Sequence, residues 1–134
     1  MIHPEVHCVL VTPERTVCDV PAEFVALPLF DGELGVAPGR APMIGRLGCG
    51  ELRIVSHKGT VRYYVEGGFV EVTGGVVNVL TPRAIAAEDL DAAVAQEQLT
   101  TARSRPASTP DAQDARTRAV DVARAQLRVA RRAK

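Results

Sequence analysis

The chain has 134 residues, 46% of them hydrophobic and 24% charged, which suits one ordinary domain or a small domain with an appendage. Sixteen basic residues balance sixteen acidic ones, so the net charge argues against a simple nucleic-acid binder. No apolar run approaches the ~18 residues of a membrane span, and the first residues lack the pattern of a secretory signal.

The zero net charge is the sum of two unlike parts. Residues 1–88 carry seven Lys and Arg against ten Asp and Glu, whereas residues 89–134 carry nine against six. Glycines and aromatic residues are confined to the first part, and most alanines follow residue 83. This change indicates short strands followed by helix. We therefore expect a β domain over 1–87 and an α-helical part over 88–134.

Alternating apolar residues predict a first strand over 6–11, which ends at Thr12-Pro13. Short apolar runs separated by turn signals predict further strands at 24–28, 52–56, 61–65, 69–72 and 76–80. Many positions in them are apolar on both faces, which we expect where two sheets cover each other. The pattern predicts an antiparallel β-sandwich.

The segment 32–42 holds three glycines and two prolines, a composition that predicts a rigid loop rather than a strand. It lacks the Gly-Lys-Ser/Thr of a phosphate-binding loop. Two interpretations stay open: a structural corner of the sandwich, or a surface presented to a partner with Glu33 and Arg40 as charged contacts.

The second part predicts two helices joined at Pro106. The first covers about 90–105, with Asp89 as N-cap, and the second begins at Thr109-Pro110-Asp111 as N-cap, N1 and acidic first turn. Along the second helix, apolar residues up to Ala133 share one side and arginines share the other. Because the apolar residues are mostly alanine, we expect a marginal hairpin that can detach from the sandwich.

Five blocks of the first part occur in a fixed order: TPER (12–15), FVALP (24–28), DGELG (31–35) followed by PGRAP (38–42), GELR (50–53) and GGFVEV (67–72). In these blocks the chain resembles the epsilon subunit of F-type ATP synthases, called delta in mitochondria. The resemblance implies a β-sandwich followed by a helical hairpin, no active site, and a sandwich that binds the gamma subunit and the c-ring. It also implies a peripheral position on the cytoplasmic face of the bacterial inner membrane, held there only through the complex.

The resemblance assigns contacts to two places. The loop matching 32–42 faces the c-ring in this family, which makes Asp31, Glu33, Leu34 and Arg40 candidate ring contacts. The family usually has His where this chain has Arg40, so a permanent cation replaces a titratable group.

In many bacterial members the hairpin extends along gamma, and its basic residues meet acidic surfaces of the catalytic β subunits and block ATP hydrolysis. The candidates here are Arg116, Arg118, Arg124 and Arg128, chosen from charge and position, and a solvated helix surface is the alternative.

Some relatives bind ATP through an Ile/Leu-Asp-x-x-Arg-Ala segment at the start of the first helix. Here Val94 replaces the arginine of that segment, and valine can neither donate a hydrogen bond nor carry charge. We therefore expect no useful ATP binding and no other cofactor.

A nucleic-acid-binding module built on the basic helix is the alternative function. It lacks aromatic residues to stack on bases, since none follows Phe69. We do not expect an enzyme, because the sequence shows no nucleophile–base pair, no clustered carboxylates and no metal-ligand spacing. The three cysteines show no CxxC spacing, so we expect buried apolar roles for them and no metal.

Overall fold

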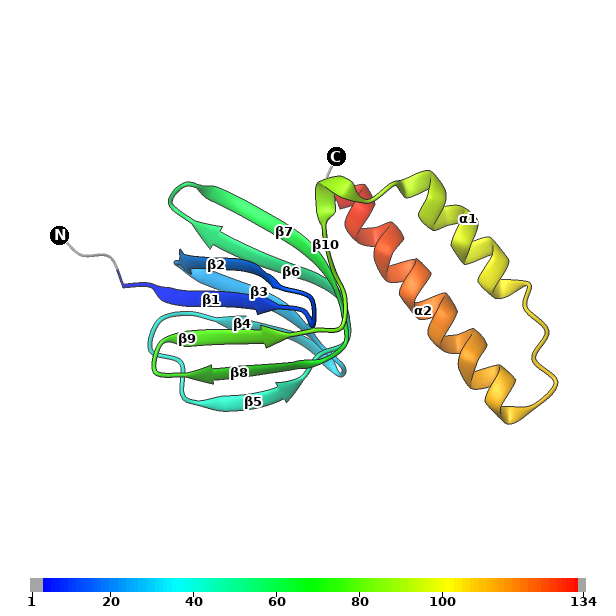
Figure 1. Ribbon diagram of the computed structural model, residues 1–134, viewed down its shortest axis with the longest axis horizontal. Helices are drawn as coiled ribbons and strands as arrows, with labels where there is room; N and C mark the ends of the chain where they lie inside the picture. The colour runs from blue at the N-terminus through cyan, green and yellow to red at the C-terminus, as the bar shows by residue number, and fades with distance from the viewer. Residues whose placement is uncertain (1–3, 133–134) are drawn as a thin grey trace.

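The computed structural model describes residues 4–132, and Ala133 lies outside them. Within this range ten strands form two five-stranded sheets that face each other, followed by a short 3-10 helix and two α-helices (Figure 1). The predicted β-sandwich with two C-terminal helices is confirmed. The strands are β1 Val6–Val11, β2 Thr16–Ala22, β3 Phe24–Leu29, β4 Gly32–Val36, β5 Met43–Arg46, β6 Cys49–Ser56, β7 Gly59–Glu66, β8 Phe69–Thr73, β9 Val76–Leu80 and β10 Ala84–Ala86.

The first sheet has the strand order β2-β1-β9-β8-β5, and the second has the order β10-β7-β6-β3-β4. All paired strands are antiparallel except β1 and β9, which run parallel. Consecutive strands joined by tight turns account for the antiparallel pairs, such as β6 with β7 and β8 with β9. This parallel pair brings the first strand of the sandwich, β1, beside β9, which comes late in its sequence.

The core of the sandwich consists of the inward-facing residues of both sheets, among them Leu10, Leu27, Leu52 and Val70. Cys8 is fully buried there, as expected for a small apolar side chain, whereas Cys18 and Cys49 are half-buried. All three thiols are free.

The prediction that 32–42 forms a loop throughout is wrong for its first half. Gly32–Val36 is strand β4, because the hairpin at Phe30–Asp31 brings it alongside β3, with Leu34 opposite Leu27. Inward-facing Leu34 and Val36 supply the alternation of a strand in spite of the glycines. Only the segment 37–42 remains outside regular strands. Strands β2, β5 and β10 were not predicted.

The helical part begins with the 3-10 helix η1, Ala87–Asp89, and continues with α1, Ala92–Arg103. The N-cap of α1 is Asp91 and not Asp89, because Asp89 belongs to the preceding 3-10 turn. Helix α2, Pro110–Arg132, starts as predicted: the Thr109 hydroxyl accepts a 3.1 Å hydrogen bond from the amide of Ala112. Among the described residues, neither helix is long and apolar enough to cross a membrane.

Candidate functional site

Helix α2 rather than α1 carries the contact between the hairpin and the sandwich (Figure 1). On the sandwich side the contact centres on Tyr64 of β7, a fully buried side chain on the outer face of the second sheet. Ala125 and Val129 of α2 pack on it, together with Ala87 of η1. A second small core joins the two helices through Leu99 and Leu127. Helix α2 is therefore buried on two sides.

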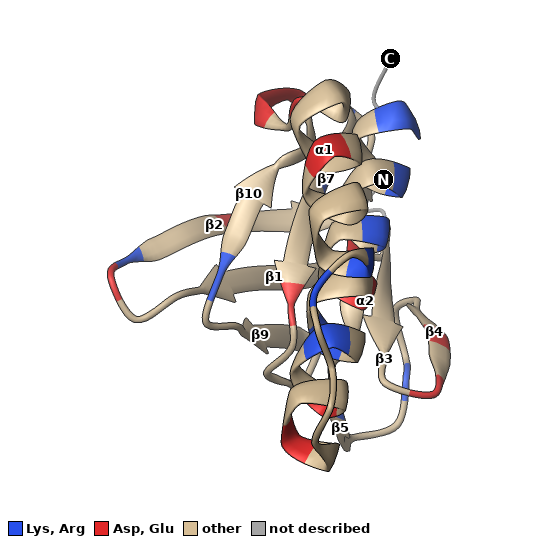
Figure 2. Cartoon of the chain, turned by 90° about the vertical axis from the view of Figure 1, so that its right-hand side faces the viewer, with Lys and Arg blue, Asp and Glu red and all other residues tan. Residues whose placement is uncertain are grey.

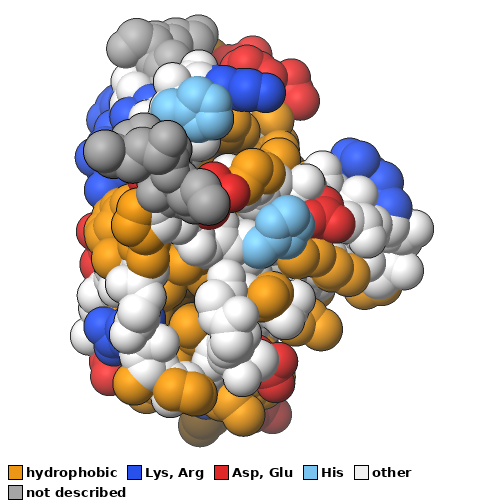
Figure 3. Space-filling model, turned by 90° about the vertical axis from the view of Figure 1, so that its left-hand side faces the viewer, with side chains coloured by type: hydrophobic (Ala, Val, Ile, Leu, Met, Phe, Trp, Pro, Cys, Tyr) orange, Lys and Arg blue, Asp and Glu red, His pale blue; other side chains and the backbone are white. Residues whose placement is uncertain are grey.

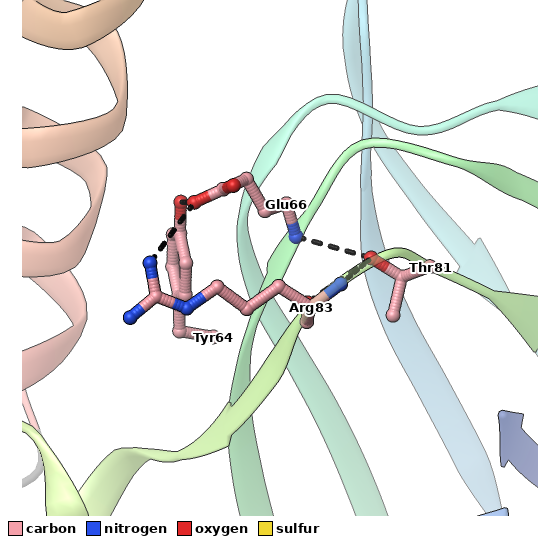
Figure 4. Close-up of polar contacts among 4 residues, drawn as sticks. All are labelled: Tyr64, Glu66, Thr81 and Arg83. Carbon is pink, nitrogen blue, oxygen red and sulfur yellow. Dashed lines mark hydrogen bonds and ion pairs between the residues drawn. The ribbon is translucent and has the colours of Figure 1, made fainter. Parts of the chain in front are cut away.

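A polar network surrounds the phenol of Tyr64 (Figure 4). Its hydroxyl donates a 2.8 Å hydrogen bond to Glu66 Oε1, and the Arg83 guanidinium lies 3.9 Å from the same oxygen. The Glu66 amide in turn donates to the Thr81 hydroxyl, which donates to the carbonyl of Arg83. The network ties β7 to the segment that leads into the hairpin.

Burial is the main reason that the pKa of Tyr64 lies well above its usual value, and the neighbouring Glu66 carboxylate adds to the rise. Burial likewise raises the pKa of the Cys49 thiol beside it. Both groups stay neutral at the surface where α2 packs, which suits an apolar contact.

Glu51 of β6 lies at the end of this contact, close to the last turn of α2. Its side chain is 8% exposed and faces three guanidinium groups: Arg53 at 3.5 Å, Arg62 at 3.7 Å and Arg132 at 3.8 Å. Arg53 and Arg62 come from the same sheet, whereas Arg132 comes from the helix.

The candidate inhibitory arginines lie on α2, where basic segments recur along the helix (Figure 2). Arg118, Arg124 and Arg128 are exposed, and Arg116 is half-buried. Three of the four candidates are therefore accessible while α2 is packed on the sandwich.

The candidate ring contacts do not lie together. Asp31 and Glu33 are exposed at the β3–β4 turn, and Glu33 lines a cavity of about 260 Å³ with Arg128 and Arg132. Arg40 lies beyond the other end of β4, where its guanidinium is 3.8 Å from the sulfur of Met43. Leu34 is 9% exposed and packs in the core, so it supports the turn from inside.

The outer face of the first sheet is uncovered, since both described helices lie on the side of the second sheet (Figure 1). Ile44 of β5, Phe69 of β8 and Leu80 of β9 are 74%, 59% and 51% exposed. Phe69 pairs directly with Leu80 across the two strands. Phe30 stands beside this face, with the Arg46 guanidinium 5.7 Å from its ring centre.

The end of the sandwich that faces away from the hairpin has a different character. There hydrophobic side chains lie among polar ones, with only scattered charged groups (Figure 3). The His7 Nε2 and the Asp19 carboxylate form a hydrogen bond between β1 and β2, with both side chains about half exposed. No group of three or more His, Cys, Asp or Glu residues that could hold a metal occurs in the described part of the chain.

Together, these features define the class of protein: a two-sheet β-sandwich with one uncovered outer face, followed by a two-helix hairpin that packs on the other sheet. The family model for the β-sandwich domain of the ATP synthase delta/epsilon chain matches residues 5–87. The chain belongs to the ATP synthase epsilon chain family. An ATP synthase epsilon chain from Rhodopirellula baltica is 55% identical over 126 residues, covering 94% of this chain and 98% of the relative. One from Rhodobacter capsulatus is 46% identical over 94 residues, covering 70% and 71%.

The fold is shared with chains of two solved assemblies. One is the Euglena gracilis mitochondrial ATP synthase, OSCP/F1/c-ring (TM-score 0.83, 22% identity, 92% of this chain and 80% of that chain). The other is the Tetrahymena thermophila mitochondrial ATP synthase, central stalk/c-ring (TM-score 0.75, 12% identity, 97% and 99%).

Several residues of these surfaces were not predicted from sequence: Glu51, Tyr64, Gln126 and Arg132. One signal was available for Tyr64, because it is an aromatic residue on the strand face that it shares with Arg62 and Glu66. Helix α2 covers this outer face of β7. Gln126 is buried beside Tyr64 in an apolar helix face, and a polar residue there has no periodic signal.

Proposed function

We propose that this chain is a non-catalytic subunit of the ATP synthase central stalk that couples c-ring rotation to ATP synthesis. The uncovered outer face of the first sheet carries the proposal. Three large apolar side chains, Ile44, Phe69 and Leu80, are exposed there on neighbouring strands, and a bare apolar face of this kind is typical of a docking surface. The gamma subunit is its proposed partner. Residues 1–87 would be the docking domain and residues 88–134 a regulatory arm.

Charge substitution on this face tests the docking surface. Phe69→Asp and Ile44→Asp should each weaken co-purification with gamma by at least about tenfold, because a carboxylate would be buried in an apolar contact. Val61→Asp is the matched control, since Val61 is also an exposed apolar residue but belongs to the second sheet. Equal binding of all three variants would defeat the assignment of this face.

We place the c-ring contact at the β3–β4 turn, where Asp31 and Glu33 are exposed. Arg40 is a separate candidate because it lies beyond the other end of β4. The complex would hold the chain at the membrane surface, on the cytoplasmic face of a bacterial inner membrane.

The arm's proposed activity is inhibition of ATP hydrolysis through contact with catalytic β subunits. Its support is the accessible basic row Arg118, Arg124 and Arg128. A truncation after Ala87, placed in the reconstituted complex, should raise ATPase activity above that of the full-length chain. Replacing the three arginines by alanine should reproduce the rise, whereas equal activity of truncated and full-length forms would remove the inhibitory role and leave docking intact.

A further inference from the structure

Glu51 and Arg132 join the sandwich to the last turn of α2. Glu51 Oε1 lies 3.8 Å from the Arg132 guanidinium, and the Arg132 side chain is 54% exposed. The Glu51 side chain is 8% exposed. Glu51 is therefore buried at the surface of the sandwich, whereas the Arg132 side chain is largely exposed to solvent.

The neighbours of Glu51 within the sheet determine whether its charge is left unpaired when α2 detaches. Arg53 and Arg62, neighbours of Glu51 on the same outer face, lie 3.5 and 3.7 Å from its carboxylate. Breaking a buried ion pair is strongly unfavourable when it strands a charge. Here the carboxylate keeps two cationic neighbours without Arg132, so the loss of the helix contact strands no charge.

The cluster is held by charge more than by hydrogen bonds. Among the described residues, Glu51 Oε2 and Arg62 Nε are buried without a hydrogen-bond partner. The separations of 3.5 to 3.8 Å exceed the roughly 2.7–2.9 Å of direct charge-assisted bonds. A cavity of about 260 Å³, lined by Glu33, Glu51, Arg128 and Arg132 among others, lies next to the pair. Water and salt ions can therefore reach the pair from this side.

We infer that the Glu51–Arg132 pair is a reversible, salt-sensitive latch that holds the last turn of α2 on the second sheet. The apolar contact of Val129 and Ala125 with Tyr64 supplies the main attraction, and the latch fixes the end of the helix beyond it. The latch opens without stranding a buried charge, so the helix end can leave and return readily. This inference concerns the chain alone and does not rest on the proposed inhibition.

Cys49 provides a native reporter for the latch. It packs at the edge of the cluster formed by Tyr64, Ala125 and Val129, so α2 shields its thiol. Cys8, fully buried in the sandwich core, reports unfolding of the whole domain in the same sample. The experiment follows alkylation of each cysteine in the full chain by N-ethylmaleimide, resolved by mass spectrometry.

The test compares Arg132→Ala with Arg131→Ala, its neighbour in the same turn, which is also exposed. The latch predicts that Arg132→Ala speeds Cys49 labelling about two- to five-fold, the range of an exposed ion pair. Cys8 labelling and the Arg131→Ala chain should match the wild type. Raising salt from about 0.05 to 0.5 M should speed Cys49 labelling in the wild type but not in Arg132→Ala. Equal Cys49 rates in the two variants would overturn the latch.

A second pair of variants tests whether Glu51 is the partner of Arg132. In a Glu51→Gln background, Arg132→Ala should no longer change Cys49 labelling or amide exchange in the last two turns of α2, because the attraction is already gone. Should Arg132→Ala keep its effect there, Arg132 acts through another group and the latch is excluded. Amide exchange supplies the same comparison if alkylation of Cys49 proves slow in every chain.

Discussion

Gly68 and Leu80 approach each other so closely that no β-carbon fits between them. A Cβ added to Gly68 would overlap the Leu80 carbonyl oxygen and lie 2.9 Å from the Cα of Thr81. Gly68 also has φ of +104°, in the region that favours glycine. The carbonyl of Gly68 accepts a 2.9 Å hydrogen bond from the Leu47 amide. This approach sets the start of β8, and with it the exposed Phe69 of the bare sheet face.

Gly68→Ala should therefore lower the free energy of unfolding by about 3 kcal/mol or more, because it combines left-handed strain with overlap against backbone atoms. Gly67→Ala is the matched control. Gly67 has φ of +74° but nothing within 4 Å of an added Cβ, so it should lose only about 1 kcal/mol. Urea unfolding of the two variants measures the difference. Similar losses would show that the backbone can move aside at Gly68.

Tyr64→Phe tests the network under α2. The change removes the 2.8 Å bond to Glu66 but keeps the ring on which Val129 packs. We expect a loss of about 1–2 kcal/mol, since the bond goes to a carboxylate in a partly buried site. Tyr63→Phe is the control, because Tyr63 is more exposed and contacts the Cys18 thiol, a weak partner. Thermal unfolding measures the loss of stability in both variants. A larger loss for Tyr63→Phe than for Tyr64→Phe would contradict the role assigned to the Tyr64 hydroxyl.

The sequence predicts most of the sandwich because strands such as β1 and β9 alternate or lie between clear turn signals. Strands β2 and β5 were not predicted because Asp19 and Pro21 interrupt the apolar residues of β2, and β5 is only four residues long and contains a glycine. The sequence misjudged β4 because its glycines indicate a loop locally, and the pairing with β3 overrides them. Nonlocal pairing is the information that a single-sequence pattern lacks.

The surfaces were predicted less completely than the fold. The arginines of α2 and the acidic β3–β4 turn were predicted from charge and resemblance, and the structure shows that most of them are exposed. The Glu51 cluster was not predicted, because it depends on register: Arg53 pairs with Arg62, and Glu51 with Tyr64, across β6 and β7. Arg132 joins them only through the packing of α2.

Alkaline pH should destabilise the chain through Cys8. Burial raises the pKa of this thiol from 9.0 to about 12, so above pH 9 the unfolded chain ionises while the folded chain stays neutral. The unfolded state then binds fewer protons, and stability falls as pH rises from 9 towards 12, by up to about 1.4 kcal/mol per unit. Below pH 9 this contribution is constant. Cys18, Cys49 and Tyr64 have raised pKa values and act in the same direction.

Urea midpoints at pH 7.5, 9 and 10.5 measure this dependence. Cys8→Ala should start less stable by about 1 kcal/mol, because it leaves a small cavity, but it should lose less on going from pH 9 to 10.5 than the wild type. Parallel losses in the two chains would show that Cys8 does not supply the alkaline sensitivity.

ATP binding provides the last prediction, and it depends on Val94. The Asp91 carboxylate accepts hydrogen bonds of 2.8 and 3.3 Å from the amides of Ala93 and Val94. Asp91 matches the aspartate of the Ile/Leu-Asp-x-x-Arg-Ala segment, so this cap is compatible with nucleotide binding. Val94 departs from the segment, since it supplies neither the charge nor the hydrogen-bond donors of an arginine. Isothermal titration of the full chain with ATP should therefore give no binding at millimolar concentration.

The variant Val94→Arg tests this cause. If the missing arginine prevents binding, this single change should restore it, whereas a Val94→Arg chain that still gives no binding would show that another part of the chain excludes the nucleotide. Val94→Lys controls for charge without the planar guanidinium. All three chains should keep the far-ultraviolet circular dichroism of the folded protein, since residue 94 is exposed on α1. Binding by the unaltered chain at or below millimolar ATP would show that Val94 does not exclude the nucleotide.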